Sequence, residues 1–358
     1  MRYNKIAVKV GSNVLTRTDG TLDVTRMSAL VDQISFLFRK GVKVILISSG
    51  AVASGRSVLK PSKKLDIVEQ RQLFSTIGQA KLINHYYELF RNHNIVVGQV
   101  LTTKTNFDGR VNYLNQRNCM SVMLNNCVIP IVNENDAVSV SELMFTDNDE
   151  LSGMIASMMG VQALVILSNV DGVYDGAPKD SGSKVIREIK RHEKLSDFIQ
   201  NSKSEFGRGG MQTKVSIAQK IADEGIDVII ANGKKEDILI DLLDSEKDTV
   251  STLFRASKIE VSGVKKWLAH SDDFAKGKVY INENAEKALS GSNAVSLLPV
   301  GITKISGVFE KDDIIKIFSE KEKFLGVGKA QFNSEKANQI IGKKNQRPLV
   351  HYDYLYLD

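Results

Sequence analysis

A lysine and a glycine near the start of the chain have the types and the order needed to hold a phosphate group. Lys9 stands near the end of the apolar residues 6–10, and Gly11 opens a turn in the segment KVGSN. A lysine ammonium can bridge phosphate oxygens, and a glycine lets backbone N–H groups approach them closely. The alternative interpretation is an ordinary solvated lysine at the end of a strand.

Small residues follow a second apolar run, residues 42–47. They are Ser48, Ser49, Gly50 and Ala51. Such residues leave room for a ligand and expose backbone donors where the next helix begins. The alternative is a tight turn that only joins a strand to a helix.

Short polar side chains gather in two places in the middle of the chain. They are Asn133, Glu134, Asn135 and Asp136 after the apolar residues 128–132, and Asp147, Asn148 and Asp149 before a predicted helix. These types are poor core material, and they offer acceptors for an ammonium and donors for a carboxylate, as an amino-acid ligand requires. Two alternatives stay open: helix capping by residues 147–149 beside a solvated loop, and a metal site made by Asp147 and Asp149.

The fourth cluster is the segment GRGGMQTK, residues 207–214, which opens a helix with an apolar face. Glycines at a helix N-terminus, followed by Lys214 in its first turn, combine bare N–H groups, the helix dipole and an ammonium into an anion site. The GxxxxGK[ST] spacing of a Walker A loop is absent. A flexible linker that leads into an ordinary helix is the alternative.

The elements that must position these clusters alternate between strands and helices. Apolar side chains recur at steps of three and four behind Asp23, a good N-cap, so a helix follows the first strand. We expect further helices near residues 71–90, from about 149 and over 211–223, and further strands over 95–101, 128–132, 163–167 and 227–231. This alternation predicts an α/β domain with an open, mainly parallel sheet sandwiched by helices. Ligands of such sheets bind at the carboxyl ends of strands, where all four clusters lie.

The pattern changes after about residue 260. Residues 258–275 look like a connection with one or two helical turns around Trp267. Beyond it, short β-rich segments over 279–281, 306–309, 314–317 and 324–327 are separated by glycines. We therefore expect a first domain over 1–260, a linker over 261–276 and a small β-rich domain over 277–358.

Bulk composition limits the classes of protein that fit. The chain has 358 residues, of which 42% are hydrophobic, enough for two cores. Its 48 Lys and Arg against 42 Asp and Glu suit a polyanionic ligand such as a nucleotide without demanding nucleic acid. The two cysteines form no CxxC pair and the histidines show no metal-ligand spacing, so we expect no protein metal site and a reducing, cytoplasmic setting. No apolar stretch approaches the roughly 18 residues of a membrane span.

Taken together, the motifs resemble the amino-acid kinase family. The segments VKVGSNVL, SSGAVASG, VNENDAV, TDNDELS and GRGGMQTK occur in the order and approximate spacing of that family. The NENDAV segment is typical of its glutamate kinase branch rather than of the acetylglutamate, aspartate, carbamate or uridylate kinases. The tail resembles a PUA domain, because residues 290–302 match the start of that module. The resemblance implies the amino-acid kinase fold and transfer of the terminal phosphoryl group of ATP to the side-chain carboxylate of L-glutamate, the first step of proline biosynthesis.

The resemblance also implies roles for single residues. Lys9 and Lys214 would contact the transferred phosphoryl group, and Asp149 would hold the two lysines in place. Glutamate would be bound by Ser49, Gly50, Asn133, Asp136 and Asn148. The nucleotide would be bound by Lys9, Gly11, Ser168, Asn169, Gly209, Gly210, Met211, Thr213 and Lys214. The sequence departs from the family at Ser168 and Asn169, where a threonine and an aspartate are common, which puts the adenine and ribose contacts in question.

Several ligands and partners follow from the same resemblance. ATP with Mg²⁺ would be required, proline would inhibit at a site that overlaps the glutamate site, and a glutamate-5-phosphate reductase would consume the product. We also expect a homo-oligomer, either a dimer or a tetramer. Two rival functions stay open: a kinase of the same fold with another acceptor, and an RNA-binding protein in which the second domain does the main work. Basic and acidic residues are nearly balanced over 278–358, so RNA binding is not expected.

Overall fold

The chain forms two compact units in a computed structural model. The structure describes residues 1–138, 148–176, 182–190, 210–258, 263–291 and 295–357. The first unit comprises residues 1–106 and 114–260, and the second comprises residues 107–113 and 261–358. Residues 107–113 therefore group with the carboxyl-terminal part of the chain. The predicted linker over 261–276 stays a prediction.

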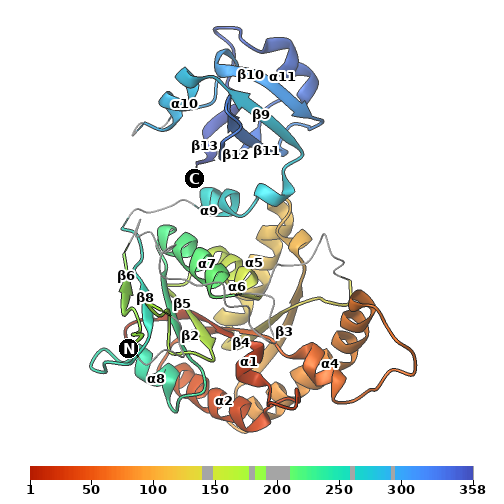
Figure 1. Ribbon diagram of the computed structural model, residues 1–358, viewed down its shortest axis with the longest axis vertical. Helices are drawn as coiled ribbons and strands as arrows, with labels where there is room; N and C mark the ends of the chain where they lie inside the picture. The colour runs from red at the N-terminus through yellow and green to blue at the C-terminus, as the bar shows by residue number, and fades with distance from the viewer. Residues whose placement is uncertain (139–147, 177–181, 191–209, 259–262, 292–294, 358) are drawn as a thin grey trace. The chain divides into compact units, whose positions relative to one another are not determined.

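The first unit is built on an eight-stranded, mainly parallel sheet (Figure 1). Its strand order is β3-β4-β2-β1-β5-β7-β8-β6, and of the neighbouring pairs only β7 and β8 run antiparallel. The strands are β1 (Lys5–Val10), β2 (Lys43–Ser48), β3 (Val96–Thr102), β4 (Val128–Glu134), β5 (Ala163–Ser168), β6 (Glu188–Ile189), β7 (Asp227–Asn232) and β8 (Thr252–Phe254). The prediction of an open, mainly parallel α/β sheet is confirmed.

Strand register brings the carboxyl ends of the central strands to one edge of the sheet. Val10 at the end of β1 pairs with Ser48 of β2 on one side and with Leu167 of β5 on the other. Ser168 at the end of β5 pairs in turn with Asn232 of β7. Residues that follow these strands are therefore neighbours in space, as expected for the ligand-binding edge of an open parallel sheet.

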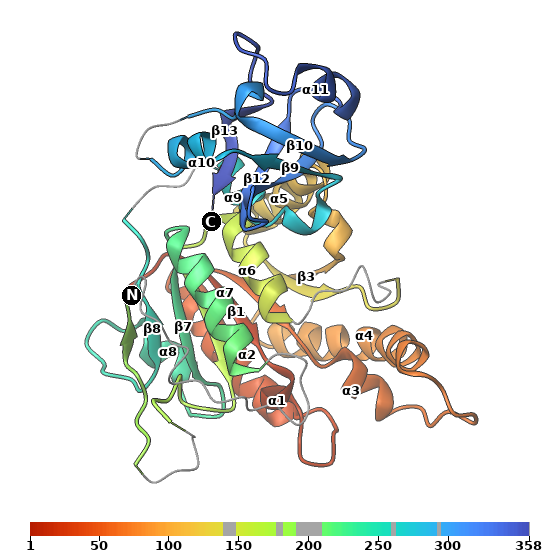
Figure 2. The same cartoon turned by 45° about the horizontal axis from the view of Figure 1, so that its top comes forward.

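Helices cover both faces of this sheet (Figure 1, Figure 2). Helices α2, α4 and α8 lie on one face, and α6 and α7 lie on the other. The helices of this unit are α1 (Ser12–Leu15), α2 (Val24–Arg39), α3 (Ala51–Arg56), α4 (Ile67–Arg91), most of α5 (Arg110–Asn125), α6 (Asn148–Met159), α7 (Met211–Asp223) and α8 (Ile238–Leu243), with one 3₁₀ turn, η1 (Lys104–Asn106).

Period-two alternation decides which face receives Lys9. Ile6, Val8 and Val10 of β1 are buried in a core shared with α2, α4 and α8. Successive side chains of a strand point to opposite faces, so Ala7 and Lys9 face α6 and α7. The burial pattern of β1 thus fixes Lys9 on the side of the sheet where Asp149 and Lys214 begin their helices.

Local signals explain most of the predicted elements. Asp23 caps α2, because its Oδ1 accepts a hydrogen bond from the Arg26 N–H at 3.0 Å. Helix α7 spans Met211–Asp223 as predicted. Helix α5, in contrast, was not predicted. Its sequence, RVNYLNQRNCMSVMLN, contains four asparagines, which disfavour helix interiors, and its apolar periodicity is weak.

The second unit contains a five-stranded sheet in the order β10-β9-β11-β12-β13. Its strands are β9 (Gly277–Ile281), β10 (Ile302–Gly307), β11 (Ile314–Ser319), β12 (Phe324–Ala330) and β13 (Val350–Leu357). The helices are α9 (Gly263–Ala269), α10 (Glu283–Leu289) and α11 (Ser334–Ile340), with 3₁₀ turns η2 (Asp272–Phe274) and η3 (Pro299–Gly301). A small β-rich unit was predicted, and the structure confirms it.

One predicted strand of this unit is displaced. Residues 306–309 were expected to form a strand, but β10 spans Ile302–Gly307. Gly307 has φ +89°, a left-handed conformation that ends the strand and turns the chain away.

In the part of the chain that the structure describes, no helix has the length and apolar character needed to cross a membrane.

Candidate active site

Two lysines from distant segments bind one aspartate at the carboxyl edge of the large sheet. The Lys9 Nζ lies 2.6 Å from Asp149 Oδ1, and the Lys214 Nζ lies 2.8 Å from Asp149 Oδ2. The Asp149 side chain is 1% exposed, that of Lys9 is 6% exposed and that of Lys214 is 14% exposed. The predicted convergence of Lys9 and Lys214 on Asp149 is therefore present as geometry.

The charge state of Asp149 follows from this pairing. Burial alone raises the pKa of the Asp149 carboxyl, but the charges of Lys9 and Lys214 outweigh burial and hold that pKa below its usual value. The carboxylate is thus ionised at neutral pH. Two ammonium groups on one carboxylate leave a net positive charge in a largely buried place, which favours an anionic ligand.

Two short helix starts aim these side chains. Helix α6 begins at Asn148, so Asp149 lies in its first turn. Helix α7 begins at Met211 after its N-cap Gly210, and the Lys214 N–H donates to the Gly210 carbonyl at 3.3 Å. The amino ends of both helices therefore lie beside the lysine pair, where bare N–H groups and helix dipoles favour negative charge.

Glycines shape the turns after β1 and β2. The Gly11 N–H donates to the Leu167 carbonyl at 3.1 Å, and a Cβ on Gly11 would lie 3.5 Å from the Lys9 Nζ. Gly11 therefore lets the backbone pack closely beside the Lys9 ammonium group. Gly50 has φ +107° and is the N-cap of α3, a conformation that glycine adopts without strain.

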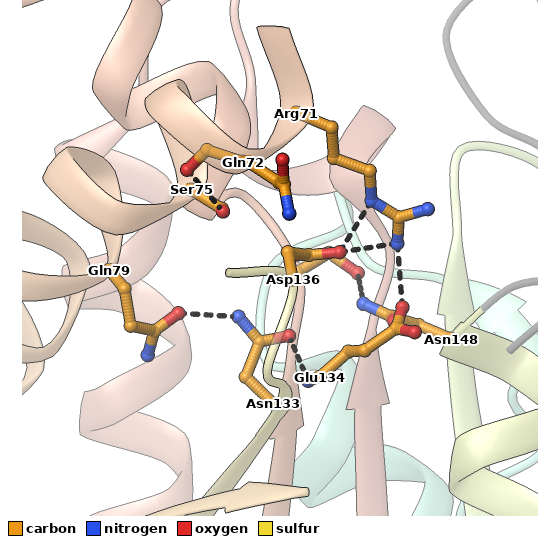
Figure 3. A network of polar contacts seen from close by, with 9 residues as sticks. Arg71, Gln72, Ser75, Gln79, Asn133, Glu134, Asp136 and Asn148 are labelled. Atoms are coloured by element: carbon orange, nitrogen blue, oxygen red, sulfur yellow. Dashed lines mark hydrogen bonds and ion pairs between the residues drawn. The ribbon is translucent and has the colours of Figure 1, made fainter. Parts of the chain in front are cut away.

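A second polar network surrounds Arg71 at the carboxyl end of β4 (Figure 3). The Arg71 Nε donates to Asp136 Oδ1 at 2.5 Å, and its Nη2 contacts the same oxygen. Nη2 also lies 2.6 Å from Glu134 Oε2. The Glu134 side chain is 2% exposed and that of Asp136 is 9% exposed. The Arg71 side chain is 16% exposed. A guanidinium thus lies between two nearly buried acids.

Two amide pairs extend this network. The Asn133 Nδ2 donates to Gln79 Oε1 at 2.7 Å, and the Asn133 Oδ1 accepts from the Glu134 N–H at 2.9 Å. The Asn148 Nδ2 donates to Ser49 Oγ at 2.7 Å. In Figure 3 the Asn148 side chain points toward Glu134 and its neighbours. The Asn148 contact joins the start of α6 to the loop after β2, and the Asn133 contact joins the end of β4 to α4.

Consecutive residues join the two parts of the site. Asn148 donates to Ser49 and is drawn beside the Arg71 network in Figure 3, and Asp149, the next residue, binds Lys9 and Lys214. Asn148 and Asp149 are the first two residues of α6. A ligand that contacts both parts would span from a cluster suited to an amino acid to a cluster suited to a phosphate.

Sequence reasoning missed three residues of this site. Arg71 and Gln79 lie on α4, and Glu134 was noted in its segment without being selected as a site residue. The signal was present on α4: the polar residues Arg71, Gln72, Ser75 and Gln79 recur at helical spacing. The Gln72 Nε2 also donates to the Ala137 carbonyl at 3.1 Å. A polar stripe that faces a strand end indicates a site rather than a solvated surface.

Two of the residues predicted to bind the nucleotide, Ser168 and Asn169, lie at the end of β5. Ser168 is nearly buried, and its Oγ lies 3.4 Å from Asn169 Oδ1. Asp171, which was not predicted, accepts from Asn232 Nδ2 at 2.9 Å and pairs with the Lys235 Nζ at 3.0 Å. Burial opposes these contacts, but they hold the pKa of the Asp171 carboxyl below its usual value.

The predicted nucleotide residues of α7 are only partly covered by the structure. Gly210, Met211 and Thr213 lie at its amino end and are half-buried. Gly209 and Asp147 lie outside the described residues.

The described residues do not fit a resident magnesium ion. Among the residues that the structure describes, no group of three His, Cys, Asp or Glu side chains could hold a metal. Both oxygens of Asp149, the carboxylate nearest the lysines, face ammonium groups.

The fold and this lysine–aspartate centre define a class of protein, and comparisons with known proteins agree on it. The model of the amino acid kinase family matches residues 4–232, and that of the PUA domain matches residues 277–352. The first match covers more than half of the chain. The chain belongs to the amino acid kinase family.

Curated relatives narrow the family to one branch. The chain is 65% identical to a glutamate 5-kinase of Bacteroides thetaiotaomicron over 356 residues, 99% of each chain. It is 48% identical to a glutamate 5-kinase of Chlorobaculum tepidum over 357 residues, 99% of this chain and 98% of the relative. A solved UMP kinase of Bacillus anthracis, 15% identical with a TM-score of 0.50, covers 73% of this chain and shares its fold.

Proposed function

We propose that the chain transfers the terminal phosphoryl group of ATP to the side-chain carboxylate of L-glutamate, the first step of proline biosynthesis. The observation that carries the proposal is the junction at Asn148 and Asp149. There, a network of amides and carboxylates adjoins a pair of lysines on one buried aspartate. The relatives that match over nearly the whole chain are glutamate 5-kinases, which supports glutamate as the acceptor.

Acceptor chemistry needs no general base. A glutamate side chain titrates near about 4.3, so the attacking carboxylate is already ionised at neutral pH. The difficulty is to bring this anion up to the anionic phosphates of ATP, and catalysis is therefore positioning and neutralisation of charge. Lys9 and Lys214 supply the positive charge, and Asp149 fixes the separation and direction of the two ammonium groups.

Each end of the site has its ligand. Ser49, Gly50, Asn133, Asp136 and Asn148 would bind glutamate. The nucleotide would lie against Gly11, Ser168, Asn169 and the amino end of α7, residues 209–214. The lysine pair lies between them, in contact with the phosphoryl group as it moves from ADP to the side-chain oxygen of glutamate. Mg²⁺ neutralises part of the charge of ATP when bound to its phosphates.

The partners follow from the same assignment. The product is a labile acyl phosphate, so a glutamate-5-phosphate reductase would consume it. Proline would inhibit by binding near residues 133–149. A homo-oligomer is expected from the family. The free thiols of Cys119 and Cys127 suit the reducing cytoplasm.

An acceptor screen tests the proposed function. The protein is incubated with MgATP, hydroxylamine and one candidate acceptor at a time, so that an acyl phosphate is trapped as a hydroxamate. We expect ATP-dependent hydroxamate with L-glutamate and at most about 1% of that rate with N-acetylglutamate or aspartate. Equal or faster reaction with another acceptor would overturn the assignment of glutamate.

A further inference from the structure

Arg71 lies in the part of the site that is proposed to bind glutamate. Its guanidinium contacts Asp136, a predicted glutamate-binding residue, and also Glu134 (Figure 3). These contacts hold a fixed positive charge within the acceptor network. The guanidinium is the most exposed of the three charged groups, so it is the one that a ligand reaches first.

We propose that Arg71 selects the substrate by exchanging ion pairs, an inference that rests on the proposed function. The α-ammonium of glutamate replaces Arg71 as the partner of the Asp136 carboxylate. The released guanidinium then binds the α-carboxylate of glutamate. Glu134 keeps its contact with Arg71 during the exchange. Arg71 is thus a specificity-determining residue for the α-carboxylate.

Charge balance favours an exchange over a simple addition. Breaking a nearly buried ion pair and leaving either partner without a counter-charge would be strongly unfavourable. The α-carbon of glutamate carries one positive and one negative group, so it can insert between Arg71 and Asp136 with every charge still paired. A substrate that lacks either group would leave Arg71 or Asp136 without its partner.

The orientation of the substrate is set by the other end of the site. The reacting side-chain carboxylate must lie by Lys9 and Lys214, which bind Asp149. Asn148 is one residue away, and Figure 3 draws its side chain beside the network of Arg71 and Asp136. The α-carbon of glutamate therefore points away from the lysines and toward the guanidinium.

Helix α4 holds Arg71 rigidly enough for this role. A capping box closes the start of the helix: the Glu69 N–H donates to Asp66 Oδ1 at 2.8 Å, and the Asp66 N–H donates to Glu69 Oε2 at 2.9 Å. Arg71 lies just beyond this box. An arginine also suits a carboxylate better than a lysine does, because its planar fork can donate two parallel hydrogen bonds.

Truncated substrates test the exchange. 4-Aminobutyrate is glutamate without its α-carboxylate, and glutarate is glutamate without its α-ammonium. We would measure kcat/KM for all three with the wild type, Arg71→Gln and Arg71→Lys. Where turnover of an analogue is too slow, its Ki as a competitive inhibitor against glutamate gives the same comparison. Arg91→Gln is the matched control, because Arg91 is an exposed arginine at the other end of α4.

The wild type should prefer glutamate to 4-aminobutyrate by about 100-fold or more. In Arg71→Gln this preference should fall to within a few-fold, while the preference for glutamate over glutarate is largely kept. In Arg71→Lys, which keeps the charge and the fold, the preference for glutamate over 4-aminobutyrate should be about ten-fold smaller than in the wild type. Arg91→Gln should behave like the wild type.

Two results would overturn the proposal. In one, Arg71→Gln loses the preference for glutamate over glutarate but keeps the preference for glutamate over 4-aminobutyrate. That result would show that Arg71 only holds Asp136 in place. In the other, kcat/KM falls by the same factor for all three compounds in both Arg71 variants. That result would show that the role of Arg71 is merely structural. If the wild type forms no hydroxamate with glutamate, the proposed function itself fails, and that failure is seen before any variant is compared.

Discussion

Lys9 and Lys214 bind opposite oxygens of one carboxylate, that of Asp149, at 2.6 and 2.8 Å. The first lysine ends a strand and the second begins a helix, so the shared aspartate fixes their relative position. In the proposed function, these two ammonium groups at fixed separation bind a phosphoryl group that carries charge on several oxygens.

Removing one of the two ammonium groups should slow the chemical step. We expect Lys214→Ala to lower kcat about 100-fold or more, because charge that develops in the transition state loses a partner. Lys9→Ala should act in the same direction. Steady-state kinetics measure the effect, and circular dichroism checks the fold. Lys220→Ala, on the same helix, is the control, and a Lys214→Ala kcat near that of the control would contradict the assigned role.

Asp149 should make stability depend on pH in acid. Its pKa is depressed in the folded state, so its contribution to stability is complete above the unfolded value, about 3.9, and is lost as the pH falls through the lower folded value. Asp149→Asn removes this titration. Urea unfolding at pH 7, 5 and 3 should show that the wild type's advantage over Asp149→Asn is constant from 7 to 5 and smaller at 3. An advantage that grew on acidification would refute the depressed pKa.

Asp136 should affect glutamate and spare ATP. Asp136→Ala removes the acceptor for the α-ammonium, and we expect the KM for glutamate to rise at least about ten-fold with little change in the KM for ATP. Initial rates with each substrate varied in turn decide the matter. An unchanged KM for glutamate together with a raised KM for ATP would mean that the two ends of the site are reversed.

Close packing between α3 and α4 should not tolerate a methyl group. A Cβ on Gly78 would lie 1.8 Å from the Ala51 carbonyl oxygen. Gly78→Ala should therefore lower the free energy of unfolding by about 1–3 kcal/mol, despite the higher helix propensity of alanine. Urea denaturation measures this change. The control is Gly263→Ala, where a Cβ has no heavy atom within 4 Å. A Gly78→Ala variant as stable as its control would show that the helices do not approach this closely.

Periodic segments made the large sheet predictable. The apolar runs of β1, β2, β4, β5 and β7 are short, strong and interrupted by amphipathic helices, so their parallel arrangement follows from general rules. Helix α5 and strand β13 were missed, because α5 is rich in asparagine and β13 alternates weakly among tyrosines. Their places are set by tertiary contacts rather than by local preference.

The site was predictable only where a glycine, a strand end or a helix start marked it. Lys9, Asp149 and Lys214 stand beside such marks, and the structure brings them together. Arg71 lies on a polar stripe of the long helix α4, but the stripe does not indicate which strand end it covers, and the role of Arg71 depends on that pairing. Sequence patterns do not supply that pairing of distant elements.

The most direct test of the account follows the oxygen atom that glutamate contributes to the new bond. Glutamate labelled with ¹⁸O in its side-chain carboxylate is incubated with the enzyme, MgATP and hydroxylamine, and phosphate and adenine nucleotides are analysed by mass spectrometry. Attack of that carboxylate on the terminal phosphorus of ATP predicts that the phosphate released on trapping carries one ¹⁸O atom and that ADP carries none. Label in AMP, or unlabelled phosphate beside hydroxamate, would contradict direct phosphoryl transfer to glutamate.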